Sequence, residues 1–125
     1  MLYFKDDYHA AETMNLLQKF GYDSIYDSRE HTVLCYIIAA IYKGKSLAGC
    51  IDEEGVDLDS FLEKMNVFSS SERDILRFGL QLYNRNIDDI RLPDVMNHLD
   101  AENSKVVISA ITFLYRVDIT SIHEI

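Results

Sequence analysis

The sequence predicts an all-α fold, a compact single-domain bundle of about five to six helices. The chain has 125 residues, which is the length of one domain, and we expect residues 1–125 to form a single helical domain. Apolar residues make up 48% of it, enough to bury a substantial core. One proline and five glycines interrupt the chain, and so few breaks favour helices over a β fold with many turns.

The first part of the chain contains two expected helices. One covers about residues 6–20, where apolar residues share a broad helical face and a glycine follows. The second begins at Ser28 or Arg29, with Ser28 as a cap, and ends near Tyr42. Its centre, residues 33–41, is apolar on all sides, as in a buried helix or a buried strand. The length of this segment favours the helix.

A polar and acidic connector follows over residues 43–56. It contains three glycines, Gly44, Gly49 and Gly55. The next helix is expected over about residues 57–65. Its apolar residues recur at the helical spacing i, i+3, i+4 and i+7, as Leu58, Phe61, Leu62 and Met65. Asp57 or Asp59 near the start of this segment suits the positive end of the helix dipole.

Ser69 and Glu72 predict the start of another helix. In a capping box, the Ser69 hydroxyl accepts a hydrogen bond from the Glu72 backbone N–H, and the Glu72 carboxylate accepts one from the Ser69 N–H. The apolar residues that follow keep helical spacing. We expect this helix to end at Asn84 or Asn86.

Two further helices are expected in the last third of the chain. A short one over about residues 93–99 opens on a proline, which fits a first helical turn. Asp100 then caps a last helix that runs to about Val117. This helix is rich in β-branched residues, and alternating apolar residues over 106–115 keep a strand as the alternative. No secondary structure is predicted for residues 118–125.

Acidic residues dominate the charge, since 21 Asp and Glu against 12 Lys and Arg give a net charge of −9. This charge argues against direct binding to nucleic acid or to an anionic membrane, because both require a cationic face. No apolar run approaches the roughly 20 residues of a membrane span, and the N-terminus lacks a signal-peptide pattern. Two cysteines, Cys35 and Cys50, are too few for a disulfide scaffold. We therefore expect a cytoplasmic protein.

The residues that commonly catalyse reactions or bind metals form no recognisable motif. Four histidines lack the spacing of a metal site: His9, His31, His98 and His123. Residues 52–63 resemble a calcium loop at its first, third and last positions, but Val56 and Asp57 stand where a ligand and a glycine are needed. We expect no catalytic residue, no cofactor and no metal site. A small metal-dependent hydrolase stays a remote alternative, based only on the abundance of carboxylates.

Six acidic residues and no basic residue occupy one short stretch: Asp52, Glu53, Glu54, Asp57, Asp59 and Glu63. We predict that they form an acidic face that binds a basic surface of another protein. Charge complementarity would speed the encounter and make binding sensitive to salt. A solvated surface that keeps the protein soluble would explain the same charges. A second alternative is a structural protein that forms a homodimer through exposed Tyr or Phe at helix edges.

One segment has a distinctive order of residues. A serine-rich cap, Ser69-Ser70-Ser71, precedes an apolar run that ends in Leu82-Tyr83-Asn84, and Leu99-Asp100 precedes the last expected helix. In these features the chain resembles a family of small helical proteins of unknown function from Gram-positive bacteria, their prophages and other mobile elements.

The resemblance covers most of the chain, since Phe4, His9 and residues 34–38 are also similar. Relatives often carry a Gly-Trp pair ahead of the serines, where this chain has Asn66-Val67-Phe68. The resemblance implies no known reaction and no catalytic residue. It implies a bacterial cytosol and a phage or mobile-element setting, in which small acidic proteins often inhibit host defence. On this basis we expect an inhibitor of a host defence or nucleic-acid-processing complex, similar in role to anti-CRISPR proteins.

Overall fold

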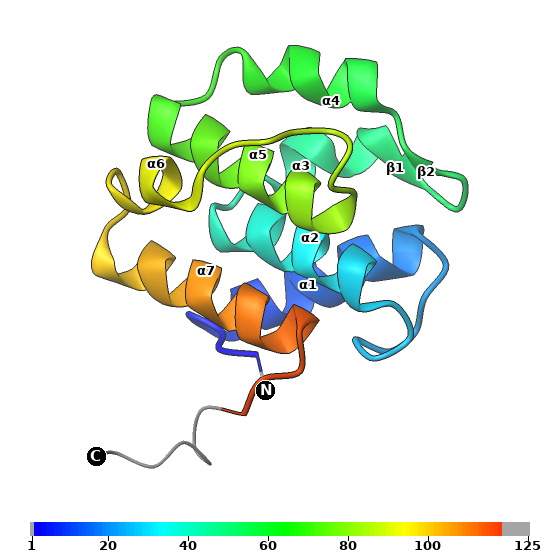
Figure 1. The fold of residues 1–125 in the computed structure, drawn as a ribbon. Coiled ribbons are helices and arrows are strands. Elements are labelled where there is room, and N and C mark those ends of the chain that lie inside the picture. The colour runs from blue at the N-terminus through cyan, green and yellow to red at the C-terminus, as the bar shows by residue number, and fades with distance from the viewer. Residues whose placement is uncertain (1, 119–125) are drawn as a thin grey trace.

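The computed structural model describes residues 2–118, and most of them are helical (Figure 1). They form seven α-helices: α1 (Asp7–Lys19), α2 (Arg29–Ala40), α3 (Gly44–Leu47), α4 (Leu58–Met65), α5 (Ser70–Tyr83), α6 (Leu92–Met96) and α7 (Ala101–Leu114). Between α3 and α4 lie a 3₁₀ turn, η1 (Ala48–Cys50), and a small antiparallel hairpin of β1 (Ile51–Asp52) and β2 (Gly55–Val56). The prediction of an all-α helical bundle is confirmed.

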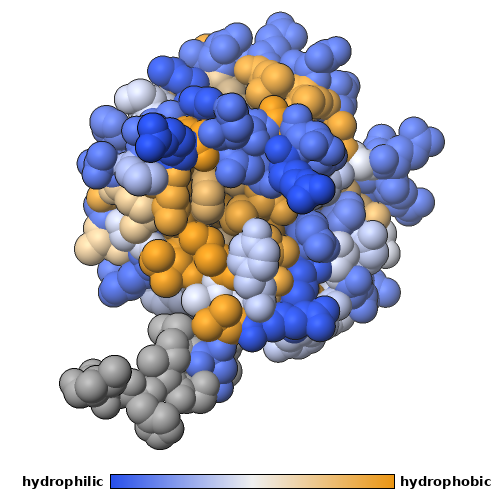
Figure 2. All heavy atoms as spheres, in the orientation of Figure 1, coloured by the Kyte–Doolittle hydropathy of each residue, from blue (hydrophilic) through white to orange (hydrophobic). Residues whose placement is uncertain are grey.

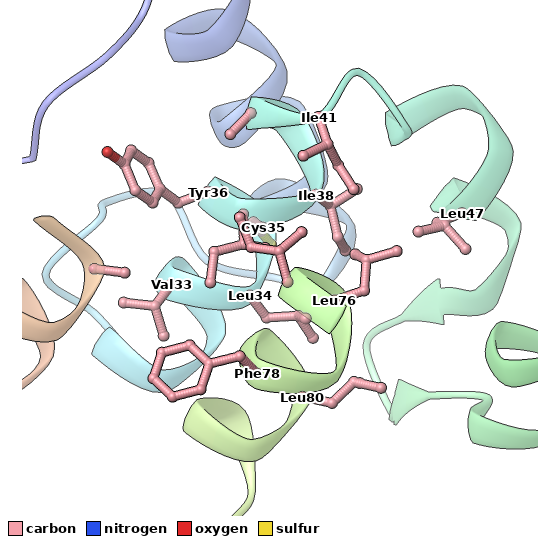
Figure 3. Close-up of a cluster of buried hydrophobic side chains, with 14 of the residues drawn as sticks. Val33, Leu34, Cys35, Tyr36, Ile38, Ile41, Leu47, Leu76, Phe78 and Leu80 are labelled. Carbon is pink, nitrogen blue, oxygen red and sulfur yellow. The ribbon is translucent and has the colours of Figure 1, made fainter. Parts of the chain in front are cut away.

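α2 is the centre of the fold, and α1, α5 and α7 pack against it (Figure 1). Every residue of α2 from Thr32 to Ala40 is buried. Figure 3 shows its side chains among those of α5, including Leu76 and Leu80. The apolar segment of residues 33–41 is thus a helix and not a strand. Because it has no polar side, it must be covered in all directions, and the helices that cover it build the core.

α5 approaches α2 closely at a glycine. A Cβ atom built on Gly79 would lie 3.3 Å from both Cδ1 and Cγ2 of Ile37, on the facing side of α2. This is closer than ordinary van der Waals contact, so a larger side chain at this position requires the Ile37 side chain or the backbone of one helix to shift. The missing side chain of Gly79 therefore allows the close packing of α5 on Ile37 of α2.

The helix caps follow the sequence closely. Ser69 Oγ accepts the backbone N–H of Glu72 at 3.2 Å, and Glu72 Oε1 accepts the N–H of Ser69 at 3.0 Å, which is the predicted capping box. The Asp100 carboxylate caps α7, also as predicted. Ser28 occupies the expected cap position of α2, but its hydroxyl bonds to the ring Nδ1 of His31 at 2.6 Å instead of to a backbone N–H.

The connector over residues 43–56 contains more regular structure than its polar composition indicates. It forms α3, η1 and the β1–β2 hairpin, and the buried side chains of Leu47 and Cys50 anchor it to the core. The backbone N–H of Asp57 donates to the Cys50 carbonyl at 2.7 Å and ties the base of the hairpin to the start of α4. Tertiary contacts hold these short elements, so they leave no periodic pattern in the sequence.

α7 is helical where the alternating residues allowed a strand, and it ends at Leu114 rather than near Val117. Arg116 adopts the left-handed conformation, with φ 59°. The N–H of Val117 bonds to the Thr112 carbonyl at 2.8 Å, and that of Arg116 bonds to the Phe113 carbonyl at 3.3 Å. These two bonds form a Schellman motif, which usually places glycine at the left-handed position. Because an arginine occupies this position, the sequence does not indicate that the helix ends here.

α6 ends at Met96, before the expected end at residue 99. All helices are short, since α5 and α7 have 14 residues each and exceed the others. None of the helices formed by residues 2–118 is long and apolar enough to cross a membrane. Of residues 118–125, for which no secondary structure was predicted, only Asp118 belongs to the described part of the chain.

His9 is buried between α1 and α2, and both of its ring nitrogens are bonded. Nε2 lies 2.9 Å from the carbonyl oxygen of Tyr36 and must donate, because the carbonyl only accepts. Nδ1 accepts the backbone N–H of Lys5 at 3.1 Å. Burial lowers the pKa of His9 below its ordinary value, and a proton on Nδ1 would break the bond from Lys5. The folded protein therefore holds this ring neutral.

This neutral ring predicts that acid destabilises the fold. The unfolded chain binds a proton at His9 below about pH 6.5, whereas the folded chain resists it, so the free energy of unfolding falls as the pH drops below that value. The expected slope from this residue is at most about 1.4 kcal/mol per pH unit. Chemical denaturation between pH 5 and 8 measures it. His9→Gln should reduce the slope, and a part should remain because burial also lowers the pKa of His31. The control His98→Gln, at an exposed position, should leave the slope unchanged. Equal profiles for all three proteins would contradict the assignment.

The close contact at Gly79 predicts a second stability effect. Gly79→Val should lower the free energy of unfolding by about 1–3 kcal/mol, because the added methyl groups overlap with Ile37. The control is Gln18→Val, at an exposed position of α1, which should cost well under about 1 kcal/mol. Urea titration compares the two variants. A Gly79→Val protein as stable as the control would show that the packing of α5 on Ile37 does not depend on this glycine.

Candidate functional site

The acidic face predicted from the sequence lies where the β1–β2 hairpin leads into α4 (Figure 1). Its members, all exposed, are Asp52, Glu53, Glu54, Asp57, Asp59 and Glu63. Gly55, with φ 127°, permits the tight turn of the hairpin. Asp59 and Glu63 are one helical turn apart and share a side of α4. The six residues thus lie on consecutive elements, four from β1 to the N-cap of α4 and two on α4 itself.

Two of these carboxylates have a structural task. Asp52 Oδ1 accepts the backbone N–H of Glu54 at 2.8 Å and shapes the hairpin turn. Asp57 Oδ1 accepts the N–H of Ser60 at 3.3 Å and caps α4. The other four side chains have no hydrogen bond or ion pair with any residue among 2–118: Glu53, Glu54, Asp59 and Glu63. Their charge is available to a partner.

Acidic residues elsewhere are partly neutralised by basic ones. Asp88 accepts two hydrogen bonds from the Arg77 guanidinium, at 2.8 Å and 2.9 Å, and this partner lowers the pKa of Asp88. Glu72 lies 3.5 Å from the ammonium group of Lys43. These acids are neutralised, whereas other exposed acids outside the face, such as Asp23, Asp89 and Asp94, form no ion pair among the described residues.

Apolar side chains adjoin the acidic face. Leu62, expected on the core side of its helix, is 41% exposed, and Val67 after α4 is 86% exposed. Leu62 follows Asp59 by three positions and precedes Glu63, so these side chains share the outer surface of α4. Phe61 and Met65 fill the core side instead. The outer surface of α4 thus combines apolar contact area with negative charge.

The acidic face offers electrostatic attraction rather than a reactive group. No set of three or more His, Cys, Asp or Glu side chains within residues 2–118 is arranged to hold a metal ion. Cys35 belongs to α2 and is buried by the helices packed against it, and this burial raises the pKa of its thiol. Cys50 is also buried, with its Sγ 3.5 Å from Ser60 Oγ. His31 packs its ring against Phe20 at a centroid distance of 4.7 Å.

A second surface feature is an open groove along α7, with a volume of about 1110 Å³. We call it the α7 groove. Its walls come from α7, the N-terminal segment and the start of α2, and they include exposed Tyr26, Ile108 and Val117. Figure 2 shows apolar surface, in orange, where α7 crosses the visible side of the molecule. The groove therefore combines apolar area with a size suited to a peptide or a similar ligand.

Hydrogen bonds fix the walls of the α7 groove. The Arg29 guanidinium donates to the Phe113 carbonyl at 2.7 Å and lies 4.4 Å from the centre of the Phe113 ring. It thereby satisfies one of the open carbonyls at the C-terminal end of α7. Tyr3 is held by its N–H, which donates to Ser109 Oγ at 2.8 Å, and by its hydroxyl, which donates to Glu102. This last bond raises the pKa of Tyr3.

The α7 groove was not predicted from the sequence. Its walls are far apart in the chain, as Tyr3, Arg29 and Ile108 illustrate, so no local motif contains them. The only local signal is the spacing of Lys105, Ile108 and Thr112, which place polar and apolar residues together on the outer side of the last helix. The apolar residues on every side of that segment obscure this pattern.

Comparison with models of protein families, with curated proteins and with solved structures finds no match to this chain. The resemblance to small helical proteins of bacteria and their mobile elements stays a prediction from the sequence.

Proposed function

We propose that this protein is a non-enzymatic binding module that attaches to a basic surface of another protein through the acidic face. The observation that supports this most is the group of four exposed carboxylates without hydrogen bonds or ion pairs among the described residues: Glu53, Glu54, Asp59 and Glu63. Four like charges at one end of a small fold repel one another. A cationic partner relieves that repulsion.

The apolar residues beside the carboxylates supply the second requirement of an interface. Leu62 lies beside Asp59 on the exposed surface of α4, and Val67 follows the helix. Protein interfaces usually combine apolar anchors at the centre with polar residues at the rim. In the proposed complex, Leu62 provides buried contact area, while the surrounding carboxylates steer the partner and fix its orientation.

The partner is a protein with a basic cleft, and clefts of this kind commonly bind nucleic acid. By occupying such a cleft, the acidic face would exclude the nucleic acid. Together with the resemblance described above, this makes the protein an inhibitor of a host defence or nucleic-acid-processing complex in the bacterial cytoplasm, similar in role to anti-CRISPR proteins. It contacts neither nucleic acid nor a membrane directly.

Self-association is the second candidate, and the exposed side chains of Tyr26, Tyr42 and Tyr115 favour it. Aromatic residues are enriched in protein interfaces. Light scattering over a series of concentrations separates the two proposals, because a homodimer gains mass without any partner. A molecular mass equal to that of one chain at every concentration would rule out self-association.

The acidic face predicts a salt-sensitive complex that charge reversal weakens. The tagged protein should retain one stoichiometric partner from host lysate at low salt and lose it at high salt. Glu53→Lys, Glu54→Lys and Asp59→Lys, combined, should weaken binding at least about tenfold, or about 1.4 kcal/mol. The melting temperature should hardly change, because exposed substitutions usually alter stability by about 0.5 kcal/mol or less. Titration calorimetry and thermal melting measure the two effects.

The matched control reverses three exposed acids outside the acidic face, Asp23→Lys, Asp89→Lys and Asp94→Lys. This control changes the net charge by the same amount, so it should bind nearly as well as the original protein. If both triple variants weakened binding equally, the loss would follow from the change in net charge alone, and the acidic face would be rejected as the contact. Parallel loss of folding and binding would reject it as well.

A further inference from the structure

We propose that the α7 groove binds an amphipathic helix of a partner protein, one that carries acidic residues beside its apolar side. This is a second binding surface, and its charge is opposite to that of the acidic face. The proposal does not depend on the function proposed for the acidic face, since α4 and α7 lie on different sides of the molecule (Figure 1). The shape, the backbone and the charge of the groove support it.

The groove is long and open. It follows α7 from Ala101 past the last turn to Arg116, and it includes Ser104, Ile108 and Thr112 at helical spacing. α7 has 14 residues and is about 21 Å long at a rise of 1.5 Å per residue. Small molecules usually bury about 70–90% of their surface in a site, which suits a cleft more closed than this one. The shape therefore favours a rod with one side in the groove and the other in solvent.

The backbone of the groove favours a helix over an extended segment. Its lining residues belong to α7, to the start of α2 or to segments outside the β1–β2 hairpin. An extended partner usually bonds its backbone N–H and C=O groups to the edge of a strand, and the groove has no such edge. A helix satisfies these groups within itself. It needs only side-chain contacts from the groove.

The groove offers apolar contacts on walls that are held in place. Tyr26, Ile108 and Val117 line it and are 64%, 44% and 48% exposed. The Arg29 guanidinium lies 5.5 Å from the centre of the Tyr26 ring while it donates to the Phe113 carbonyl. Helices that bind in grooves insert apolar side chains at helical spacing between such walls. The apolar side of the partner helix lies here.

The charge of the groove is the reverse of the charge of the protein. Three of the 12 basic residues line it, Arg29, Lys105 and Arg116. Among the residues that the structure describes, only one of the 21 acidic residues does so, Asp118. Surfaces that bind each other usually have complementary potentials. The partner helix is therefore acidic where it meets these cations.

The three basic side chains retain the capacity to bind carboxylates. Arg29 donates to the Phe113 carbonyl through Nη1, and the rest of its guanidinium carries further N–H groups. Arg116 is exposed and forms no ion pair within residues 2–118. Lys105 lies 3.2 Å from Glu102, but both side chains are more than half exposed, and such pairs contribute little. A partner carboxylate can replace Glu102 at small cost.

The positions of these cations specify a pattern in the partner. Lys105 and Arg116 are about three helical turns apart, and Ile108 lies between them on the same side of α7. A helix beside α7 can meet both cations with acidic residues that are also about three turns apart. An apolar residue between them meets Ile108. The expected order along one side of the partner helix is thus acidic, apolar, acidic.

Selection from displayed random peptides tests this pattern on the full chain. The peptides have about 18 residues, long enough to span the groove as a helix. Peptides that bind the Ile108→Gln variant equally well are discarded, because this neutral substitution removes an apolar contact of the groove only. We expect the remaining peptides to carry the acidic, apolar, acidic order at helical spacing. Enrichment of basic peptides, of peptides without helical spacing, or of none would overturn the proposal.

Charge reversal measures the role of the basic side chains. Lys105→Glu combined with Arg116→Glu should weaken binding of the enriched peptide at least about tenfold, as fluorescence polarisation reports. The matched control, Arg85→Glu with Arg91→Glu, changes the net charge equally at exposed positions outside the groove and should weaken binding less than about twofold. Thermal melting verifies that both variants are folded. Equal weakening in the two variants would overturn the proposal.

Nuclear magnetic resonance locates the site and separates the other occupants. The enriched peptide should shift the amide signals of Ser104, Ile108 and Thr112 and leave those of α4 unchanged. Shifts confined to other surfaces would overturn the proposal. Shifts along α7 with dodecanoate, when no peptide is enriched, would replace it with a site for a small anionic amphiphile. A molecular mass that doubles with concentration, and that the peptide restores to one chain, would replace it with a contact between two copies.

Discussion

The fold depends on one constraint: α2 has no side that can face water. Its residues from Thr32 to Ala40 are all buried, and its last carbonyls need partners inside the protein. Lys5 supplies one of them, since its ammonium group donates to the Ala40 carbonyl at 2.8 Å. α1, α5 and α7 must cover the helix from different directions, and each of them keeps one side for the solvent or for a partner. Both candidate binding surfaces lie on the outer parts of this arrangement.

Local interactions made much of the fold predictable. The capping box of Ser69 and Glu72 and the cap at Asp100 involve residues three positions apart, so the sequence displays them directly. The all-round apolar run identified α2 for the same reason. The hairpin and α3 were not predictable, because buried side chains such as Leu47 hold them through distant contacts. The end of α7 escaped prediction because Arg116 adopts a conformation that sequence patterns assign to glycine.

The acidic face and the α7 groove also differ in how far the sequence predicts them. The six acidic residues follow one another within a short stretch of sequence, so the sequence displays them directly, and all six are exposed. The exposure of Leu62 was not, because helical spacing places it at the edge of the apolar side of α4, and only the surrounding packing decides. The α7 groove combines residues near both ends of the chain, as in the bond between the Tyr3 N–H and Ser109, and no local pattern indicates such a pair.

That bond, across 106 positions of sequence, also has a consequence for biosynthesis. The N-terminal segment and α2 cannot reach their final environment before α7 has been translated. At about 5–20 residues per second, the ribosome needs about 4–15 s to proceed from the end of α2 to the end of α7. During that time α2, which is buried from Thr32 to Ala40, lacks at least one of the three helices that cover it. The nascent chain therefore exposes an apolar segment of the kind that chaperones bind, and this segment is buried in the completed fold.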